Sequence, residues 1–136
     1  MEKRRIVLDT NCLVQIIGHM SPTHKVWSSF ISGDYILCYS DDVLREYEEI
    51  LGQLISPQIA NIITEIIITS PFAERVDPRY HFGLITADPD DNKFVDCAII
   101  AGAELIVTED SHFNILKEID FPRIEVMRLL QFMALL

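Results

Sequence analysis

Short runs of apolar residues alternate with longer amphipathic stretches along the chain, and the two patterns predict two kinds of element. The predicted strands cover residues 5–9, 35–39, 75–77, 105–108 and 124–127. The predicted helices cover residues 12–18, 22–32, 41–51, 57–69, 89–103 and 129–136. Because parallel strands need crossover connections, this alternation predicts an α/β fold. We expect a three-layer α/β/α sandwich with a central parallel sheet of four to five strands.

Capping residues mark the start of several of these helices. Ser21-Pro22, Ser56-Pro57 and Asp88-Pro89 each place an N-cap residue before a proline, which is favoured at the first helical position. Ser40 precedes a further helix and also has the character of a cap. The helix that follows Asp88-Pro89 is apolar nearly throughout from Phe94 to Ala103, which predicts that other elements pack on almost all of its sides.

The length and composition are those of one ordinary globular domain. The 136 residues are 49% apolar and 24% charged, so we expect a single domain over residues 1–136. The sequence shows no run of about 18 apolar residues and no leader pattern, which predicts a cytoplasmic protein without a membrane segment. Cys12, Cys38 and Cys97 lie far apart in apolar segments and lack the paired spacing of a zinc site, so they indicate buried, reduced thiols.

The net charge limits the kinds of partner that the surface can hold. Lys and Arg number 11 against 21 Asp and Glu, which gives a formal net charge of −10. The field of the whole protein therefore repels nucleic acids and argues against tight binding through a basic face. This objection weakens if many of the carboxylates gather around divalent cations, because a bound cation reverses the sign of the local field.

Two acids follow predicted strands directly. Asp9 ends the first strand, and Asp110 follows the strand at 105–108. In open parallel sheets the functional groups collect at the carboxyl ends of the strands, so these two side chains come close together if their strands are neighbours. Adjacent carboxylates are costly unless a cation or proton lies between them. The pattern predicts a site for Mg²⁺ or Mn²⁺, ions that prefer carboxylate oxygens and can activate water against a phosphodiester.

Three segments carry a resemblance to a known family. They read LDTN at 8–11, SDDVLREYEEIL at 40–51 and DPDDNKFVDCAIIAGAELIVTED at 88–110. With their spacing and the order of strands and helices between them, the chain resembles the PIN-domain family over nearly its whole length. The resemblance is to the toxin-like bacterial branch related to VapC ribonucleases. It implies a PIN-like α/β/α fold and metal-dependent cleavage of RNA by four carboxylates.

Carried over residue by residue, the resemblance implies one set of catalytic, metal-binding side chains. These are Asp9, Glu46, Asp91 and Asp110, acting with Mg²⁺ or Mn²⁺. Asn11 and Thr108 are expected to orient carboxylates or water by hydrogen bonds. Lys93, in the helix that carries Asp91, is the candidate contact to phosphate.

Neighbouring residues compete for some of these assignments. Glu46 and Glu48 flank opposite edges of the apolar stripe of their helix, so helical geometry cannot choose between them. Asp91 and Asp96 lie about 140° apart on a helix and are not expected to face the same cation, which makes Asp96 the second choice. His112 lies close to Asp110 in sequence. A lone loop histidine is usually solvent-exposed, however, so His112 is left outside the predicted site.

The function expected from these residues is that of a metal-dependent endoribonuclease, the toxin of a toxin–antitoxin pair. The expected partners are RNA and an antitoxin protein, and the apolar ending LLQFMALL suggests a homodimer unless it forms a core helix. Two alternatives stay open. One is a receiver-like phosphoacceptor domain of a signalling system, which normally needs adjacent acids after its first strand, whereas Asp9 stands alone. The other is a catalytically silent PIN-like binding module.

Overall fold

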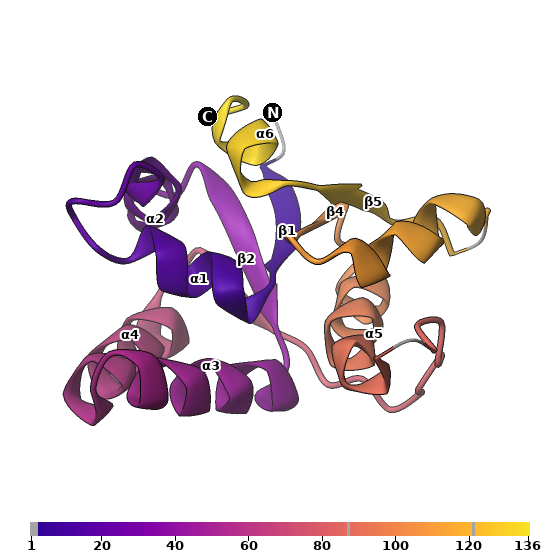
Figure 1. The fold of residues 1–136 in the computed structure, drawn as a ribbon, viewed down its shortest axis with the longest axis horizontal. Coiled ribbons are helices and arrows are strands. Elements are labelled where there is room, and N and C mark those ends of the chain that lie inside the picture. Colours follow the sequence, from indigo (N-terminus) through magenta and orange to yellow (C-terminus); the bar gives the residue numbers. More distant parts are fainter. Residues whose placement is uncertain (1–2, 87, 121) are drawn as a thin grey trace.

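Five parallel strands form one sheet within the residues that the computed structural model describes, 3–86, 88–120 and 122–136 (Figure 1). The strands are β1 Arg4–Leu8, β2 Tyr35–Tyr39, β3 Ala73–Arg75, β4 Leu105–Val107 and β5 Glu125–Met127. Their order in the sheet is β3-β2-β1-β4-β5. The predicted α/β fold with a central parallel sheet is confirmed. The order differs from the 2-1-3-4-5 order of receiver domains, so the signalling alternative is wrong.

The sheet is centred on β1, whose last three residues are fully buried. Ile6, Val7 and Leu8 are at most 1% exposed. β1 pairs with β2 on one side and with β4 on the other, where Leu8 is in register with Val107. Because both neighbours run parallel to β1, the residues that follow β1 and β4 emerge at the same edge of the sheet.

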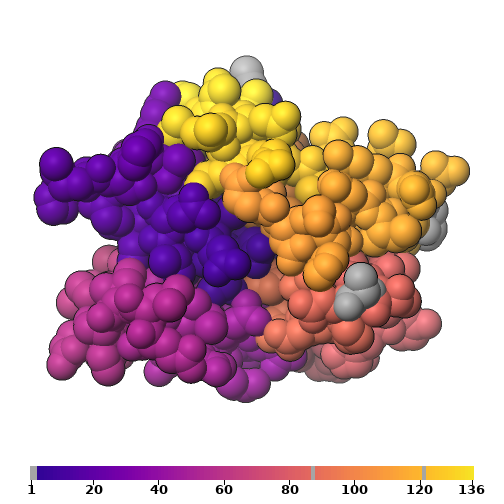
Figure 2. All heavy atoms as spheres, viewed as in Figure 1, coloured from indigo at the N-terminus to yellow at the C-terminus, as the bar shows by residue number. Residues whose placement is uncertain are grey.

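Helices and 3₁₀ segments connect the strands. They are α1 Thr10–Ile16, α2 His24–Ile31, α3 Asp41–Leu54, α4 Pro57–Thr69, η1 Pro89–Asp91, α5 Asn92–Ala101, η2 Ser111–Glu118 and α6 Leu129–Met133. α5 packs against β1, β2 and β4, α2 packs against β2, and α3 and α4 lie side by side (Figure 1). In the space-filling view α6, in yellow, covers the junction between the N-terminal segment and the segment around β4 and η2 (Figure 2).

The expected burial of the helix after Asp88-Pro89 holds for most of α5. Phe94, Val95, Cys97 and Ala98 are at most 1% exposed, whereas Ile100 is 44% exposed on the remaining side. Burial of one large apolar side chain of this kind stabilises a fold by about 1.5–3 kcal/mol. α5 is therefore held firmly, and the turn at its N-terminus is placed against β1 and β4.

The proline rule succeeds at one helix and fails at another. Ser56 caps α4 by accepting a hydrogen bond from the Ile59 amide, as predicted. The Ser21-Pro22 prediction is wrong, because α2 begins only at His24. The Ser21 hydroxyl lies 3.1 Å from the Thr23 hydroxyl, and the His24 amide donates to the Ser21 carbonyl over 3.1 Å. These local hydrogen bonds form a turn in competition with a first helical turn.

Several further boundaries differ from the predicted ones. β3 covers 73–75 rather than 75–77, and only the Val76 amide continues the pairing, by donating to the Tyr39 carbonyl. α5 ends at Ala101 because Gly102 adopts a φ of 64°, a left-handed conformation that closes a helix. α6 ends at Met133 rather than at the last residue. η2 was not predicted, since 3₁₀ segments lack the periodicity of an α-helix.

The three cysteines have free, buried thiols, as the sequence predicted. Burial raises the pKa of Cys12 to about 12 and the pKa of Cys38 to about 11, so these thiols stay protonated and unreactive at neutral pH. Across the described ranges, the longest apolar helices fall short of what a bilayer crossing requires.

Candidate metal centre

Asp9 and Asp110 lie at one edge of the sheet and share a hydrogen-bonding partner. The Asp9 amide extends the β1–β4 pairing by donating to the Val107 carbonyl over 3.0 Å. The buried Thr108 hydroxyl donates to Asp9 Oδ2 over 2.7 Å and accepts from the Asp110 amide over 3.0 Å. Thr108 thus connects the two acids and fixes the orientation of the Asp9 carboxylate.

Glu46 reaches the same edge from α3. The hydroxyl of Thr10, the first residue of α1, donates a short hydrogen bond to Glu46 Oε2. Lys93 Nζ lies 3.0 Å from Glu46 Oε1, and both side chains are about four-fifths buried. Glu48, the competitor on the same helix, is exposed and faces the groove between α3 and α4 instead. Only Glu46 of the two approaches Asp9.

Asp91 completes the set from η1, the turn before α5. Its side chain is 14% exposed, and its Oδ2 atom is buried without a hydrogen-bond partner among the described residues. The closest polar group is the His112 ring, whose Nδ1 lies 3.5 Å from Asp91 Oδ2. A buried carboxylate oxygen without a partner is costly, so this atom calls for a ligand that the protein does not supply.

The acids at this edge disfavour one another's ionised forms. Burial, followed by the nearby Asp110, Asp88 and Asp9, raises the pKa of Asp91 to about 7, while the His112 ring opposes the rise. Burial also raises the pKa of Asp9, and Glu46 and Asp110 add to the rise while the Thr108 hydrogen bond opposes it. Acids with raised pKa values on neighbouring elements are typical of functional sites. An all-oxygen set of this kind fits a hard divalent cation such as Mg²⁺ or Mn²⁺.

The structure leaves two of the sequence candidates outside this edge. Asn11 is exposed and makes no side-chain hydrogen bond to any described residue, whereas its neighbour Thr10 holds Glu46. Asp96 is 3% exposed and accepts from the Phe82 amide over 3.0 Å and from His81 over 3.1 Å. It secures the loop before α5 and lines a hollow of about 320 Å³, which Lys93 also lines.

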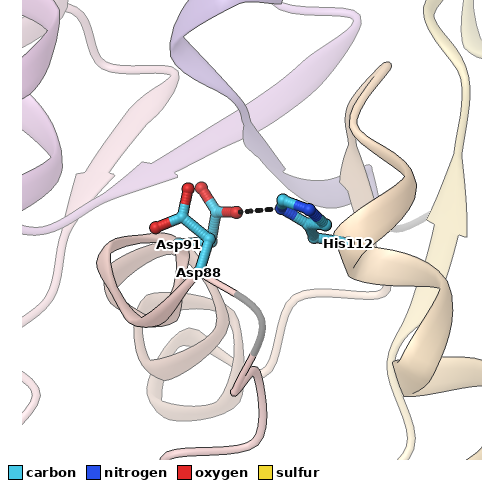
Figure 3. A group of neighbouring side chains, drawn as sticks. All are labelled: Asp88, Asp91 and His112. Atoms are coloured by element: carbon cyan, nitrogen blue, oxygen red, sulfur yellow. Dashed lines mark ion pairs between the residues drawn. The ribbon is translucent and has the colours of Figure 1, made fainter.

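Two residues near the acids were not predicted to belong to the site. His112 lies 3.4 Å from Asp110 and 3.5 Å from Asp91 through its Nδ1 atom. Figure 3 shows Asp88 and Asp91 facing His112 across the space between η1 and η2, and one ligand atom of each lies within 4.8 Å of the others. The spacing of His112 to Asp110 was the available signal, because Asp110 caps η2 and thereby holds residue 112 beside it.

Comparisons with known proteins agree with this fold. A chain of VapBC2 from Rickettsia felis, solved bound to a DNA fragment from their promoter, is 15% identical, with a TM-score of 0.63 over 91% of this chain and 98% of that one. The PIN domain endonuclease Utp24 is 21% identical, with a TM-score of 0.53 over 91% and 84%. A chain of FitAcB from Neisseria gonorrhoeae is 16% identical, with a TM-score of 0.55 over 92% and 98%. No curated protein matched the sequence.

A family comparison carries the assignment further than these fold likenesses. The model described as PIN domain matches residues 5–112, a span that holds β1 to β4 and all four of the predicted acids. The resemblance noted in the sequence is confirmed, and this chain belongs to the PIN-domain family.

Proposed function

We propose that this protein is a metal-dependent endoribonuclease whose active site is the acidic edge, defined as Asp9, Glu46, Asp91 and Asp110. The observation that carries the proposal is the buried, unpartnered Oδ2 atom of Asp91 among acids that raise its pKa. Such an arrangement is unfavourable for the protein alone and favourable around a divalent cation. Membership of the PIN-domain family supports the same conclusion.

The acids of the edge and the residues beside them would have different tasks. Asp9, Asp91 and Asp110 would hold Mg²⁺ or Mn²⁺. Such an ion, when bound, polarises a phosphodiester and lowers the pKa of water, so that hydroxide becomes available as the nucleophile. Thr108 keeps the Asp9 carboxylate in one orientation. Lys93 neutralises Glu46 and lies where it can also approach a phosphate oxygen.

RNA is the proposed substrate, and its binding should depend on the metal ion. The formal charge of −10 opposes nucleic-acid binding, and Lys93, the cation nearest the acids, is already paired with Glu46 and Asp90. We therefore expect weak affinity that responds more to divalent cations than to monovalent salt. Single-stranded or loop RNA is the expected form, because an unpaired strand can bend to bring one phosphodiester into the acidic edge.

The test is cleavage of a labelled single-stranded RNA of mixed sequence, and of total cellular RNA, with and without Mn²⁺. Asp9→Asn keeps the shape of the side chain and removes one ligand charge, so cleavage should fall by orders of magnitude while the protein stays folded. Asp41→Asn is the matched control, because Asp41 is an exposed acid paired with Arg75 outside the edge. This control should cleave like the wild type.

Two results would contradict the proposal. One is unchanged cleavage by the Asp9→Asn protein. The other is unchanged cleavage by the wild type in excess chelator. Both would place the activity outside the acidic edge, and a contaminating nuclease would be the first suspect.

The same proposal extends to a role as the toxin of a toxin–antitoxin pair. The support is the resemblance to the VapC-related branch together with the fold likeness to chains from VapBC2 and FitAcB. Co-expression with the product of an adjacent small reading frame should relieve growth inhibition and give a co-purifying complex. Growth inhibition that persists with Asp9→Asn would contradict a toxic nuclease.

Self-association stays a prediction, but the structure reduces the apolar surface on which that prediction rested. α6 places Leu129 and Phe132 in the core, where Phe132 packs edge-on against Tyr35. Leu130 and Leu135 remain 63% and 47% exposed. The terminal apolar stretch is therefore partly a core helix, and Leu130 and Leu135 are its large apolar side chains most available for a homodimer contact. Light scattering at tens of micromolar should give the mass of two chains, and a strict monomer would exclude the dimer.

A further inference from the structure

His112 is placed as a ligand would be placed, between two acids of the proposed active site. Its Nδ1 atom lies 3.4 Å from Asp110 Oδ1 and 3.5 Å from Asp91 Oδ2 (Figure 3). With metal–ligand bonds of about 2.1 Å, two ligands of one octahedral ion lie between about 3.0 Å apart at adjacent positions and about 4.2 Å apart at opposite ones. The separations on both sides of His112 fall within this range, so a cation can bind His112 together with either acid.

The surrounding backbone holds residue 112 beside Asp110. Asp110 is the N-cap of η2, and its Oδ1 atom accepts from the His112 amide over 2.8 Å. Residue 112 thus lies one short turn from Asp110, a neighbouring proposed ligand. On the opposite side, the Oδ2 atom of Asp91 accepts no hydrogen bond from any residue in the described parts of the chain. Asp88 adds a third carboxylate within 4.8 Å.

We propose that His112 Nδ1 is a metal ligand of the acidic edge, together with Asp91 and Asp110, and that it makes the site select Mn²⁺ over Mg²⁺. The proposal rests on the proposed function, in that the acids must hold a divalent ion. Mg²⁺ binds oxygen and gives up its water reluctantly, whereas transition-metal ions accept imidazole nitrogen readily. One nitrogen among the oxygen ligands therefore discriminates between the two ions.

A simpler role for His112 leads to the opposite result. If the ring only offsets the charge of Asp91 and Asp110 as a cation, it competes with the metal for the same oxygens. Removing it would then strengthen the binding of both ions. If the ring is a ligand, removing it weakens Mn²⁺ binding and leaves Mg²⁺ binding nearly unchanged. The sign of the effect separates the two roles.

The experiment measures metal binding directly, on protein freed of metal by chelator. Calorimetric titration gives the Mn²⁺ and Mg²⁺ affinities of the wild type, His112→Ala and His112→Asn, with unfolding temperature as a check on folding. Pulsed electron paramagnetic resonance of the Mn²⁺ complex detects ¹⁴N coupling from a bound imidazole. His19→Ala is the matched control, since His19 is an exposed histidine beyond the far end of α1.

We expect ¹⁴N coupling in the wild type and in His19→Ala, and its loss in both His112 variants. Their Mn²⁺ affinity should fall about ten-fold or more, as for other perturbed metal sites, while Mg²⁺ affinity changes by less than about three-fold. Mn²⁺ binding with no ¹⁴N coupling, or with equal losses for both ions, would overturn this inference and leave the proposed nuclease standing. If the wild type bound neither ion, both proposals would fail.

Discussion

The acidic edge and the ion pairs at β3 both contain carboxylates, but their pKa values are shifted in opposite directions. Near β3, Arg75 lies 2.6 Å from Asp41 and Arg5 lies 2.6 Å from Glu74. The hydrogen bond from Arg75 lowers the pKa of Asp41, and the hydrogen bond from Arg5 lowers the pKa of Glu74. At the acidic edge burial and neighbouring acids raise the pKa values of Asp9 and Asp91 instead.

The difference separates acids that stabilise the fold through ion pairs from acids that the fold leaves without such a partner. At β3 each carboxylate has a guanidinium partner within the chain and needs nothing further. At the acidic edge Lys93 pairs with Glu46, but a buried oxygen of Asp91 stays unsatisfied. The protein bears that cost without metal, and a bound cation would remove it. Predictions about the two regions should therefore diverge when metal is added or withdrawn.

The largest effect is expected from Asp91→Asn. Loss of this ligand should weaken Mn²⁺ binding by more than about 100-fold, beyond the usual effect of a supporting residue. In chelator the same variant should be more stable than the wild type, because it removes a buried charge surrounded by acids. Thermal unfolding with and without Mn²⁺ measures both effects.

The gain in stability should depend on pH. The folded pKa of Asp91, about 7, lies above its ordinary value of 3.8, so the native state of the wild type holds an extra proton between them. Wild-type stability therefore falls as pH rises through this range, and the advantage of Asp91→Asn in chelator should be larger at pH 8 than at pH 5. A variant less stable than the wild type at pH 8 would contradict the idea of an uncompensated acid.

A smaller effect is expected from Thr108→Val, which removes the hydrogen bond to Asp9 but keeps the shape of the side chain. Metal affinity should fall about 10- to 100-fold, and the free energy of unfolding by about 1–3 kcal/mol, because a buried carboxylate loses a donor. Thr64→Val is the control. Thr64 is also buried, and its hydroxyl donates to the Ala60 carbonyl within α4. If both variants lost metal affinity equally, Thr108 would have no special role.

The smallest effect is expected at the β3 ion pairs. Asp41→Asn removes an exposed carboxylate paired with Arg75, and exposed pairs contribute little to stability. Its unfolding temperature should drop slightly at low salt and match the wild type at 1 M salt, where the pair is screened. Mn²⁺ binding should not change. Altered Mn²⁺ binding in this variant would remove the distinction between the two regions.

The sequence predicted the sheet and its helices because hydrophobic patterning follows burial. The strand at 35–39 and the helix at 57–69 match in full, since buried apolar residues and strong caps define them. The helix start at Ser21-Pro22 was wrong because side-chain hydrogen bonds between Ser21 and Thr23 form a turn there. Such local competition is not visible in an apolar–polar pattern.

The site was harder to predict because its residues come from separate elements. Asp9 and Asp110 could be placed at the carboxyl ends of two strands, but their closeness depended on β1 and β4 being neighbours, which only the structure shows. Periodicity could not choose between Glu46 and Glu48, and the hydrogen bond from Thr10 to Glu46 appears only in the folded chain. His112 was left out because a lone loop histidine is usually solvent-exposed, although in the folded chain Asp110 holds residue 112 beside the acids.

The most direct test of the account is to locate the cation at the acidic edge. Crystals grown with Mn²⁺ and measured at a wavelength where manganese scatters anomalously would show the ion without any reference to activity. The account predicts an anomalous peak about 2.2 Å from carboxylate oxygens of Asp9, Asp91 and Asp110. Saturating Mn²⁺ with no peak among these acids, or with peaks only elsewhere, would contradict the claim that they form a metal site.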